Sequence, residues 1–154
     1  MENGAISDSQ ITASSQWDKN HAASRARLNI KMSGNMKGGW SARLLNLKQW
    51  IQVDLGRYTT VTRVATQGRN GLDQWVTKYR LLYSNHGVNF HSYKELGDTS
   101  AKVCFLNINP LPRETTYHFT TPLLQFQGHP RERELLSKIP EMSFSFFSDC
   151  VRAF

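Results

Sequence analysis

Cysteine is scarce in this chain, and its scarcity limits the kinds of site that the sequence can hold. Among 154 residues there are two cysteines, Cys104 and Cys150, which lie far apart. No Cys-x-x-Cys pair or clustered Cys/His spacing occurs, so the sequence gives no sign of a zinc site. The two thiols could pair, and the sequence leaves that pairing open.

Long apolar runs and catalytic motifs are also missing. No stretch approaches the ~18 apolar residues of a membrane-spanning helix, and residues 1–10 have neither the basic leader nor the apolar run of a signal peptide. The sequence has no Gly-x-Ser-x-Gly, Walker or His-Glu-x-x-His motif. The five histidines are widely spaced and predict no metal site. We therefore predict that the chain is not an enzyme.

Acidic residues are few, with 12 against 19 lysines and arginines, and the formal net charge is +7. The excess is concentrated in residues 16–49, where seven basic residues accompany the single acid Asp18. A basic surface favours anionic partners, which include lipid headgroups, acidic glycans and nucleic acid. Because no nucleic-acid motif is present, nucleic acid ranks last among these partners.

Short apolar runs separated by glycine, asparagine and serine indicate an all-β protein. The clearest run is 50–55, where Ile51, Val53 and Leu55 alternate with polar residues and give the strand one apolar face. We expect Gly56-Arg57 to end this strand and residues 16–48 to form extended loops. Other strands are predicted at 11–15, 60–67, 77–84, 88–93, 101–108 and 115–121. A hairpin turn is predicted at 85–87, between two of these strands.

Six segments follow one another in a recognisable order over residues 2–95. They are 4–15, Ala-Arg-Leu-Asn at 26–29, Gly-Gly-Trp-Ser at 38–41, Gln-Trp-Ile-Gln-Val-Asp-Leu-Gly at 49–56, 64–69 with 74–79, and 81–90. In this order they resemble the discoidin domain, also called the coagulation factor V/VIII type C domain. The resemblance implies a jelly-roll β-sandwich or barrel with protruding ligand-binding loops at one end.

The chain departs from that family in its last third. From about Cys104 onward the pattern is lost, apart from 118–123, which resembles a late strand. We therefore predict a discoidin-like domain over 1–125 and a divergent segment over 126–154, with the closing strands missing or replaced. Without closing strands a barrel would expose its edges. In the divergent segment, 131–138 could form helical turns and 142–147 could supply a substitute strand.

The resemblance also places the binding loops at 16–23, 31–48 and 68–74. In the first loop Trp17 beside Lys19 would suit a lipid interface or a ligand groove. In the second, methionine and leucine interleave with lysine and arginine, which would give an apolar and basic tip. The predicted ligand- or membrane-binding residues are Trp17, Lys19, Lys31, Met32, Met36, Lys37, Trp40, Arg43, Leu44, Arg69 and Asp73.

Each candidate has a structural alternative. Trp17 and Trp40 could pack on the end of the barrel, and the methionines and leucines could form a small core within their loop. Arg69 and Asp73 could form a salt-bridged or solvated turn.

Two tryptophans and two arginines are candidates for structural roles. Trp50 and Trp75 match framework positions of the family. Arg25 and Arg27 could pair with acids inside the domain, with Asp54 as one candidate partner, or they could contact an anionic ligand.

The resemblance predicts a noncatalytic, extracellular recognition or cell-adhesion module that binds a cell-surface or matrix protein or glycan. Binding to an anionic phospholipid such as phosphatidylserine is the first alternative, supported by Trp17 and the basic loops. A glycan-binding module is the second, and it ranks lower because the histidine–arginine signature of the fucose-binding branch is not found. Some relatives bind calcium, but the acids here are too sparse to name a site. The extracellular location rests on the resemblance alone.

Overall fold

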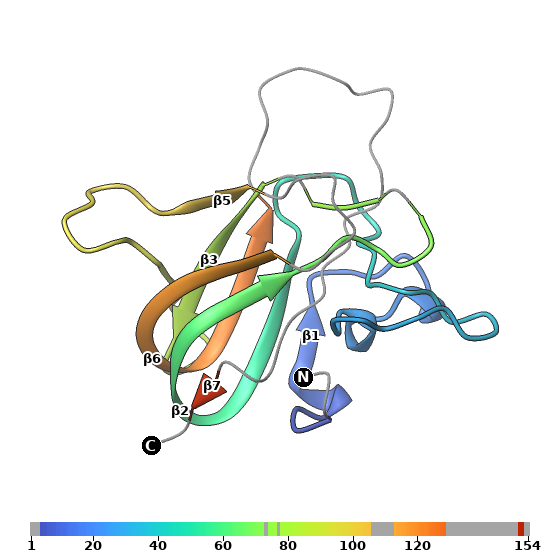
Figure 1. Cartoon of the computed structure of the whole chain (residues 1–154), viewed down its shortest axis with the longest axis horizontal. Helices are drawn as coiled ribbons and strands as arrows, with labels where there is room; N and C mark the ends of the chain where they lie inside the picture. Colours follow the sequence, from blue (N-terminus) through green and yellow to red (C-terminus); the bar gives the residue numbers. More distant parts are fainter. Residues whose placement is uncertain (1–3, 73, 77, 106–112, 129–150, 153–154) are drawn as a thin grey trace.

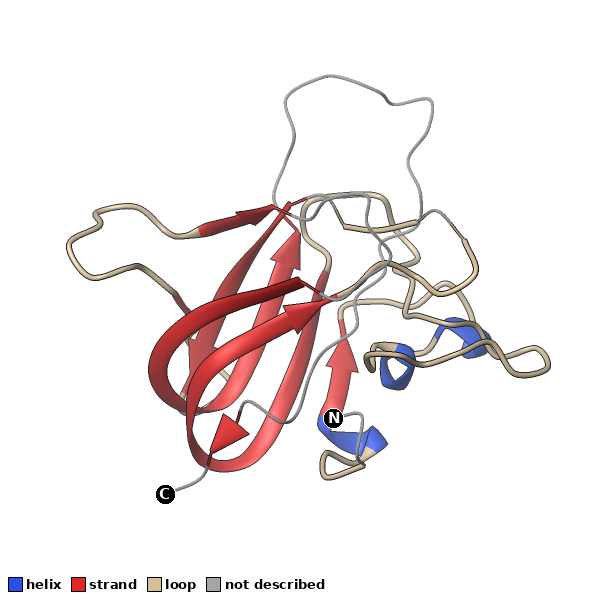
Figure 2. Cartoon of the chain, viewed as in Figure 1, coloured by secondary structure: helices blue, strands red, loops and turns tan. Residues whose placement is uncertain are grey.

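The computed structural model describes residues 4–72, 74–76, 78–105, 113–128 and 151–152. The described part consists mainly of strands that curl around a common interior, with three short 3-10 turns beside them (Figures 1 and 2). The elements are η1 Asp8–Gln10, β1 Ile11–Ala13, η2 Lys19–His21, η3 Ala23–Arg25, β2 Trp50–Thr66, β3 Lys78–Ser84, β4 His91–Ser92, β5 Val103–Phe105, β6 Arg113–Gly128 and β7 Val151–Arg152. The prediction of an all-β fold is confirmed.

The strands form one antiparallel sheet in the order β1-β2-β6-β3-β4. β6 lies between β2 and β3, so a segment from late in the chain pairs with the two long strands of the middle. β5 also pairs with β3, and β7 pairs with β2. The strands β2 and β3, which the sequence predicts clearly, therefore pair with β6, of which the sequence predicted only residues 115–121.

β2 corrects the prediction that Gly56-Arg57 ends a strand. The strand continues to Thr66, and its pairing with β6 shifts register between Asp54 and Thr59. Gly56 has a φ of +72°, and its amide donates to Asp54 Oδ1 at 2.7 Å. Glycine tolerates this left-handed conformation, so the residue forms an irregularity that bends the strand without ending it.

The interior is lined by the alternating positions of the long strands. Ile51 and Val53 of β2 are buried, and so are Tyr79 and Leu81 of β3. Phe126 of β6 packs against Tyr79 with ring centroids 5.8 Å apart. Burying each such side chain contributes roughly 1.5–3 kcal/mol, so this alternation is the main stabilising pattern of the barrel.

The other predicted strands differ mainly in length. β1 ends at Ala13, β4 covers only His91–Ser92, and the predicted 115–121 strand lies within the longer β6. The predicted turn at 85–87 is present, because Ser84 Oγ accepts hydrogen bonds from the amides of His86 and Gly87.

Several predictions for the end of the chain concern residues that the structure does not describe. The helical turns at 131–138, the strand at 142–147 and Cys150 fall outside the described residues. The domain boundary at 125 stays a prediction, although β6 crosses this point and continues to Gly128.

Candidate binding surface

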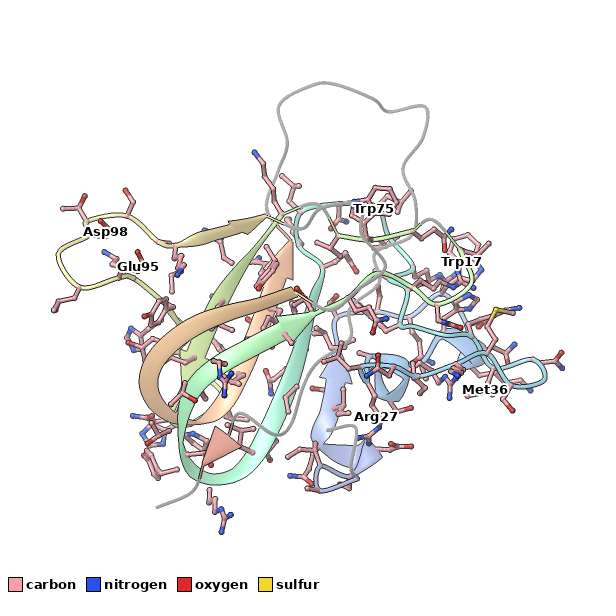
Figure 3. The ribbon with its side chains drawn as sticks, in the orientation of Figure 1. Trp17, Arg27, Met36, Trp75, Glu95 and Asp98 are labelled. Carbon is pink, nitrogen blue, oxygen red and sulfur yellow. The ribbon has the colours of Figure 1, made fainter. Side chains whose placement is uncertain are left out.

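The three predicted loops are here called loop 1 (16–23), loop 2 (31–48) and loop 3 (68–74). Figure 1 shows that they connect elements on one side of the curled sheet. Figure 3 places Trp17 of loop 1 and Met36 of loop 2 on this same side. Backbone hydrogen bonds between the loops join them into one unit.

Loops 1 and 2 are joined through their backbones. The Trp17 amide donates to the Ser41 carbonyl at 2.8 Å, and the Lys37 amide donates to the Asn20 carbonyl at 3.0 Å. The Ser41 amide in turn donates to the His21 carbonyl at 3.4 Å. Because these bonds involve backbone atoms at several points, loop 2 is fixed along the length of loop 1.

Loops 2 and 3 meet at a close contact between Gly38 and Asn70. The Asn70 amide donates to the Gly38 carbonyl at 3.0 Å. A Cβ atom on Gly38 would lie 2.7 Å from Asn70 Cβ, closer than side-chain atoms normally approach. Met32 Sδ similarly lies 3.1 Å from the position of a Cβ on Gly71. Glycine at these two positions therefore lets the loops pack side by side.

Asp18 holds the turn that follows Trp17. Its Oδ1 accepts hydrogen bonds from the amides of Asn20 and His21 and lies 2.7 Å from His21 Nδ1. The hydrogen bond with the His21 side chain is the main cause that lowers the pKa of the Asp18 carboxyl below its ordinary value of 3.8. Since the imidazole is buried, this pair anchors loop 1 to the body of the domain.

The first part of loop 2 is a tight hairpin. Ser33 and Met36 exchange two backbone hydrogen bonds of 3.1 and 3.0 Å, and Gly34 between them has a φ of +58°. A glycine in this position is typical of two-residue hairpin turns. The Arg25 guanidinium donates to the carbonyls of Lys31 and Lys37, which lie on either side of this hairpin.

The second part of loop 2 is held at its base by buried polar groups. Gln49 is buried, and its Oε1 accepts hydrogen bonds from the hydroxyls of Ser14 and Ser15. Its Nε2 donates to Asn46 Oδ1 at 2.9 Å. The Arg43 amide donates to Ser15 Oγ, so both ends of the segment are tied to the same polar cluster.

The loops expose large apolar side chains next to basic ones. Six such apolar residues, each 46–54% exposed, are Trp17, Met32, Leu44, Leu45, Leu47 and Leu72. The exposed basic residues on the same loops are Lys19, Lys31, Arg43 and Lys48, and Lys37 is half-buried. These residues together are called the loop surface below.

Most of the predicted site residues lie on the loops with exposed side chains, and Met36 and Lys37 are half-buried. Two others are buried. Trp40 is completely buried, and its Nε1 donates to the Ser15 carbonyl. Arg69 is 7% exposed and donates to Gln74 Oε1 within loop 3. These side chains support the loops from inside, so the structural alternative holds for Trp40, and neither residue belongs to the exposed surface. Asp73 lies outside the described residues.

The sequence interpretation also missed members of the loop surface. Leu47 and Leu72 were not among the predicted residues, yet both are half exposed. Leu72 could have been predicted from the sequence, because it directly follows the turn residues Asn70-Gly71. The prediction that Arg27 pairs with an acid inside the domain is confirmed, and the partner is Asp8 at 2.5 Å, where Asp54 was the candidate named from the sequence.

Two kinds of feature are absent from the described residues. Within that part of the chain no group of three or more histidine, cysteine, aspartate or glutamate side chains could hold a metal ion. In the same residues no helix has the length and apolar character needed to cross a membrane.

A curled antiparallel sheet with interlocked loops on one side defines a class of all-β ligand-binding modules. The F5/8 type C domain family matches residues 10–120, which is most of the chain. The chain belongs to the F5/8 type C, or discoidin, domain family, and the predicted recognition is confirmed. Domains of this family are typically noncatalytic ligand-binding modules.

The chain is similar to three further proteins. Coagulation factor V of Sus scrofa is 34% identical over 130 residues, which cover 80% of this chain and 6% of factor V. The chain therefore spans only a small part of that relative. Discoidin II of Dictyostelium discoideum superimposes with a TM-score of 0.73 at 19% identity, covering 88% of this chain and 52% of that one.

The third relative is a carbohydrate-binding module of Clostridium perfringens in complex with GalNAc-β-1,3-galactose. It superimposes with a TM-score of 0.62 at 17% identity, covering 94% of this chain and 92% of that module. At these identities the two solved structures show the fold alone. They confirm the predicted discoidin-like jelly roll.

Proposed function

We propose that this chain is a noncatalytic, extracellular recognition module whose loop surface binds anionic phospholipid membranes. The observation that carries the proposal is the grouping of six half-exposed apolar side chains on three interlocked loops, accompanied by exposed lysine and arginine. Apolar side chains can enter the outer part of a bilayer, while cations stay at the level of the headgroups. The surface thus offers both chemical contacts that an anionic membrane requires.

The magnitudes indicate that charge alone is insufficient. Each lysine or arginine near an anionic bilayer contributes about 1 kcal/mol, so the four exposed cations supply about 4 kcal/mol. That energy corresponds by itself to a dissociation constant of about 1 mM. A half-exposed leucine that becomes fully buried adds about 1 kcal/mol. The apolar residues are therefore needed for useful affinity, and their removal is the sharper test.

The interlocked loops reduce the ordering cost of binding. Trp17, Met32 and Leu72 belong to different loops that are joined by backbone hydrogen bonds or direct contact. Side chains that are already positioned lose less conformational freedom when they reach a membrane. The fold thus brings residues that lie far apart in the sequence onto one surface that is already ordered before binding.

The direct test is cosedimentation with vesicles that contain phosphatidylserine and phosphatidylcholine. We expect binding that depends on phosphatidylserine and weakens as salt rises, because salt screens exposed charges. The double variant W17A/L44A should bind at least ~30-fold more weakly. The matched control is V88A/L96A, which removes two exposed apolar residues outside the loop surface and should leave binding unchanged. Absence of vesicle binding at low salt would overturn the proposal.

A glycan is the second candidate ligand, favoured by the carbohydrate-binding modules among the structural neighbours. One of them is described in complex with GalNAc-β-1,3-galactose, and another as a chitosan-binding module. Free galactose, N-acetylgalactosamine and chitosan oligomers should then raise the thermal midpoint of this chain. If none of these sugars shifts the midpoint or competes with vesicles, the glycan reading is wrong.

A further inference from the structure

Arg25 connects one of the 3-10 turns to the hairpin of loop 2. It is the last residue of η3, and its side chain is half-buried. Its Nε donates to the Lys37 carbonyl at 2.6 Å, and its Nη2 donates to the Lys31 carbonyl at 2.8 Å. A single guanidinium therefore spans the two ends of the segment from Lys31 to Lys37.

This segment needs an external support. Within it, Ser33 and Met36 exchange two hydrogen bonds, and an isolated two-stranded hairpin is only marginally stable in water. Outside it, the Lys37 amide bonds to the Asn20 carbonyl, and Met32 contacts the position of Gly71. Arg25 is the side chain that binds both ends at once, so it fixes how the hairpin leaves the body of the domain.

The residues on this hairpin belong to the loop surface. Met32 is half exposed and Lys31 is exposed. The Lys31 carbonyl accepts a hydrogen bond from Arg25, and Met32 packs against Gly71. If the hairpin moves, an apolar and a basic contact are lost together. Arg25 itself contributes through the planar fork of its guanidinium, which a lysine ammonium cannot reproduce.

We propose that Arg25 is a positioning residue for membrane binding, because its guanidinium holds the 31–37 hairpin so that Met32 and Lys31 reach the bilayer together. The inference rests on the proposed function and assigns a specific internal support to it. Arg25 acts through the hairpin, and its charge does not need to touch a lipid.

The substitution R25K tests this role because it keeps the charge and removes the fork. We expect vesicle binding to weaken by about 10-fold, since the hairpin must then be ordered on binding. The salt dependence of binding should stay the same, because no charge is removed. The matched control is R27K, which alters the pair with Asp8 and should leave vesicle binding unchanged.

A second variant reaches the hairpin without changing Arg25. Gly34 has a φ of +58°, so G34A strains the turn although no atom lies within 4 Å of the new Cβ. We expect the same loss of binding with the same salt dependence. If R25K and G34A both bind vesicles like the wild type, Arg25 is not a positioning residue.

Amide hydrogen exchange gives a readout that needs no membrane. In R25K the amides of Ser33 and Met36 should exchange faster, while those of β2 and β6 stay protected. Unchanged exchange at both amides would contradict the clamp. A wild-type chain that does not bind vesicles would overturn the proposed function and the membrane role of Arg25, and the exchange data would still show whether Arg25 holds the hairpin.

Discussion

The loop surface and the opposite side of the domain expose apolar residues in different ways. Tyr58, Val88 and Leu96 are more exposed than Trp17. They lie on separate elements, because Tyr58 is in β2, Val88 follows β3, and Leu96 lies between β4 and β5. Figure 3 shows Glu95 and Asp98 on a loop that projects away from Trp17 and Met36. In that loop Lys102 pairs with Glu95, and Lys94 donates to the Thr99 carbonyl. The proposed site therefore rests on the grouping of apolar residues with cations on joined loops, and exposure alone would not distinguish it.

The barrel and the loops also differ in how they are held. The barrel rests on strand pairing and on buried side chains such as Ile51 and Phe126. The loops are held by backbone hydrogen bonds between them and by polar side chains, among them Asp18, Arg25 and Gln49. A substitution in the barrel should therefore affect the whole domain, whereas one in the loops should alter binding with less effect on stability.

The largest effect is expected from F126A in the barrel. Phe126 is buried against Tyr79, and removing a buried phenylalanine costs about 3–5 kcal/mol. The free energy of unfolding, measured by denaturant titration, should fall by this amount, and vesicle binding should fall with it. The control L96A removes a fully exposed leucine and should change stability by less than about 0.5 kcal/mol. Equal effects of the two variants would refute the assignment of the core.

G38A should separate loops 2 and 3. Its Cβ would lie 2.7 Å from Asn70 Cβ and 2.9 Å from the Asn70 carbonyl oxygen, so the loops must move apart. We expect a loss of about 1–3 kcal/mol in unfolding free energy together with weaker vesicle binding. The control G97A is strained by a φ of +92° in the opposite loop. It should lower stability and leave binding intact, and weaker binding in G97A would break the distinction between the two sides.

Much of the barrel and part of the loop surface could be predicted from the sequence. Alternation at 50–55 predicted the buried face of β2, and the apolar and basic pattern predicted exposed Trp17 and Met32. Alternation describes one strand at a time, so it could not show that β2 bends at Gly56 to remain paired with β6. The sequence left Trp40 open between ligand contact and packing, because the burial of a loop residue depends on its neighbours in space, and the structure shows it packed.

K31Q should reduce binding through charge alone. Loss of one cation near an anionic bilayer costs about 1 kcal/mol, so affinity should drop about 5-fold at low salt and converge with the wild type at high salt. K94Q makes the same charge change in the opposite loop and serves as the control. An equal loss in K94Q would mean that net charge, and not the loop surface, determines binding.

The smallest effect is expected from D18N, and it depends on pH. The pKa of Asp18 is lowered on folding, so its charge stabilises the folded state above 3.8 and this contribution disappears as pH falls through the lower folded value. Asparagine can still cap the turn, which leaves only the charge to be tested. The thermal midpoint of D18N should lie below that of the wild type at neutral pH and approach it in acid. A constant difference across this range would contradict the assignment.

The most direct measurement is the fluorescence of Trp17 with vesicles that carry brominated lipids. Trp17 is half exposed on the loop surface, whereas Trp40 is buried in the core. We predict that phosphatidylserine vesicles shift the emission to the blue and that the brominated chains quench it. Both changes should be lost in W17F. Emission that is unchanged by vesicles, or quenching that persists in W17F, would contradict the claim that the loop surface enters the membrane.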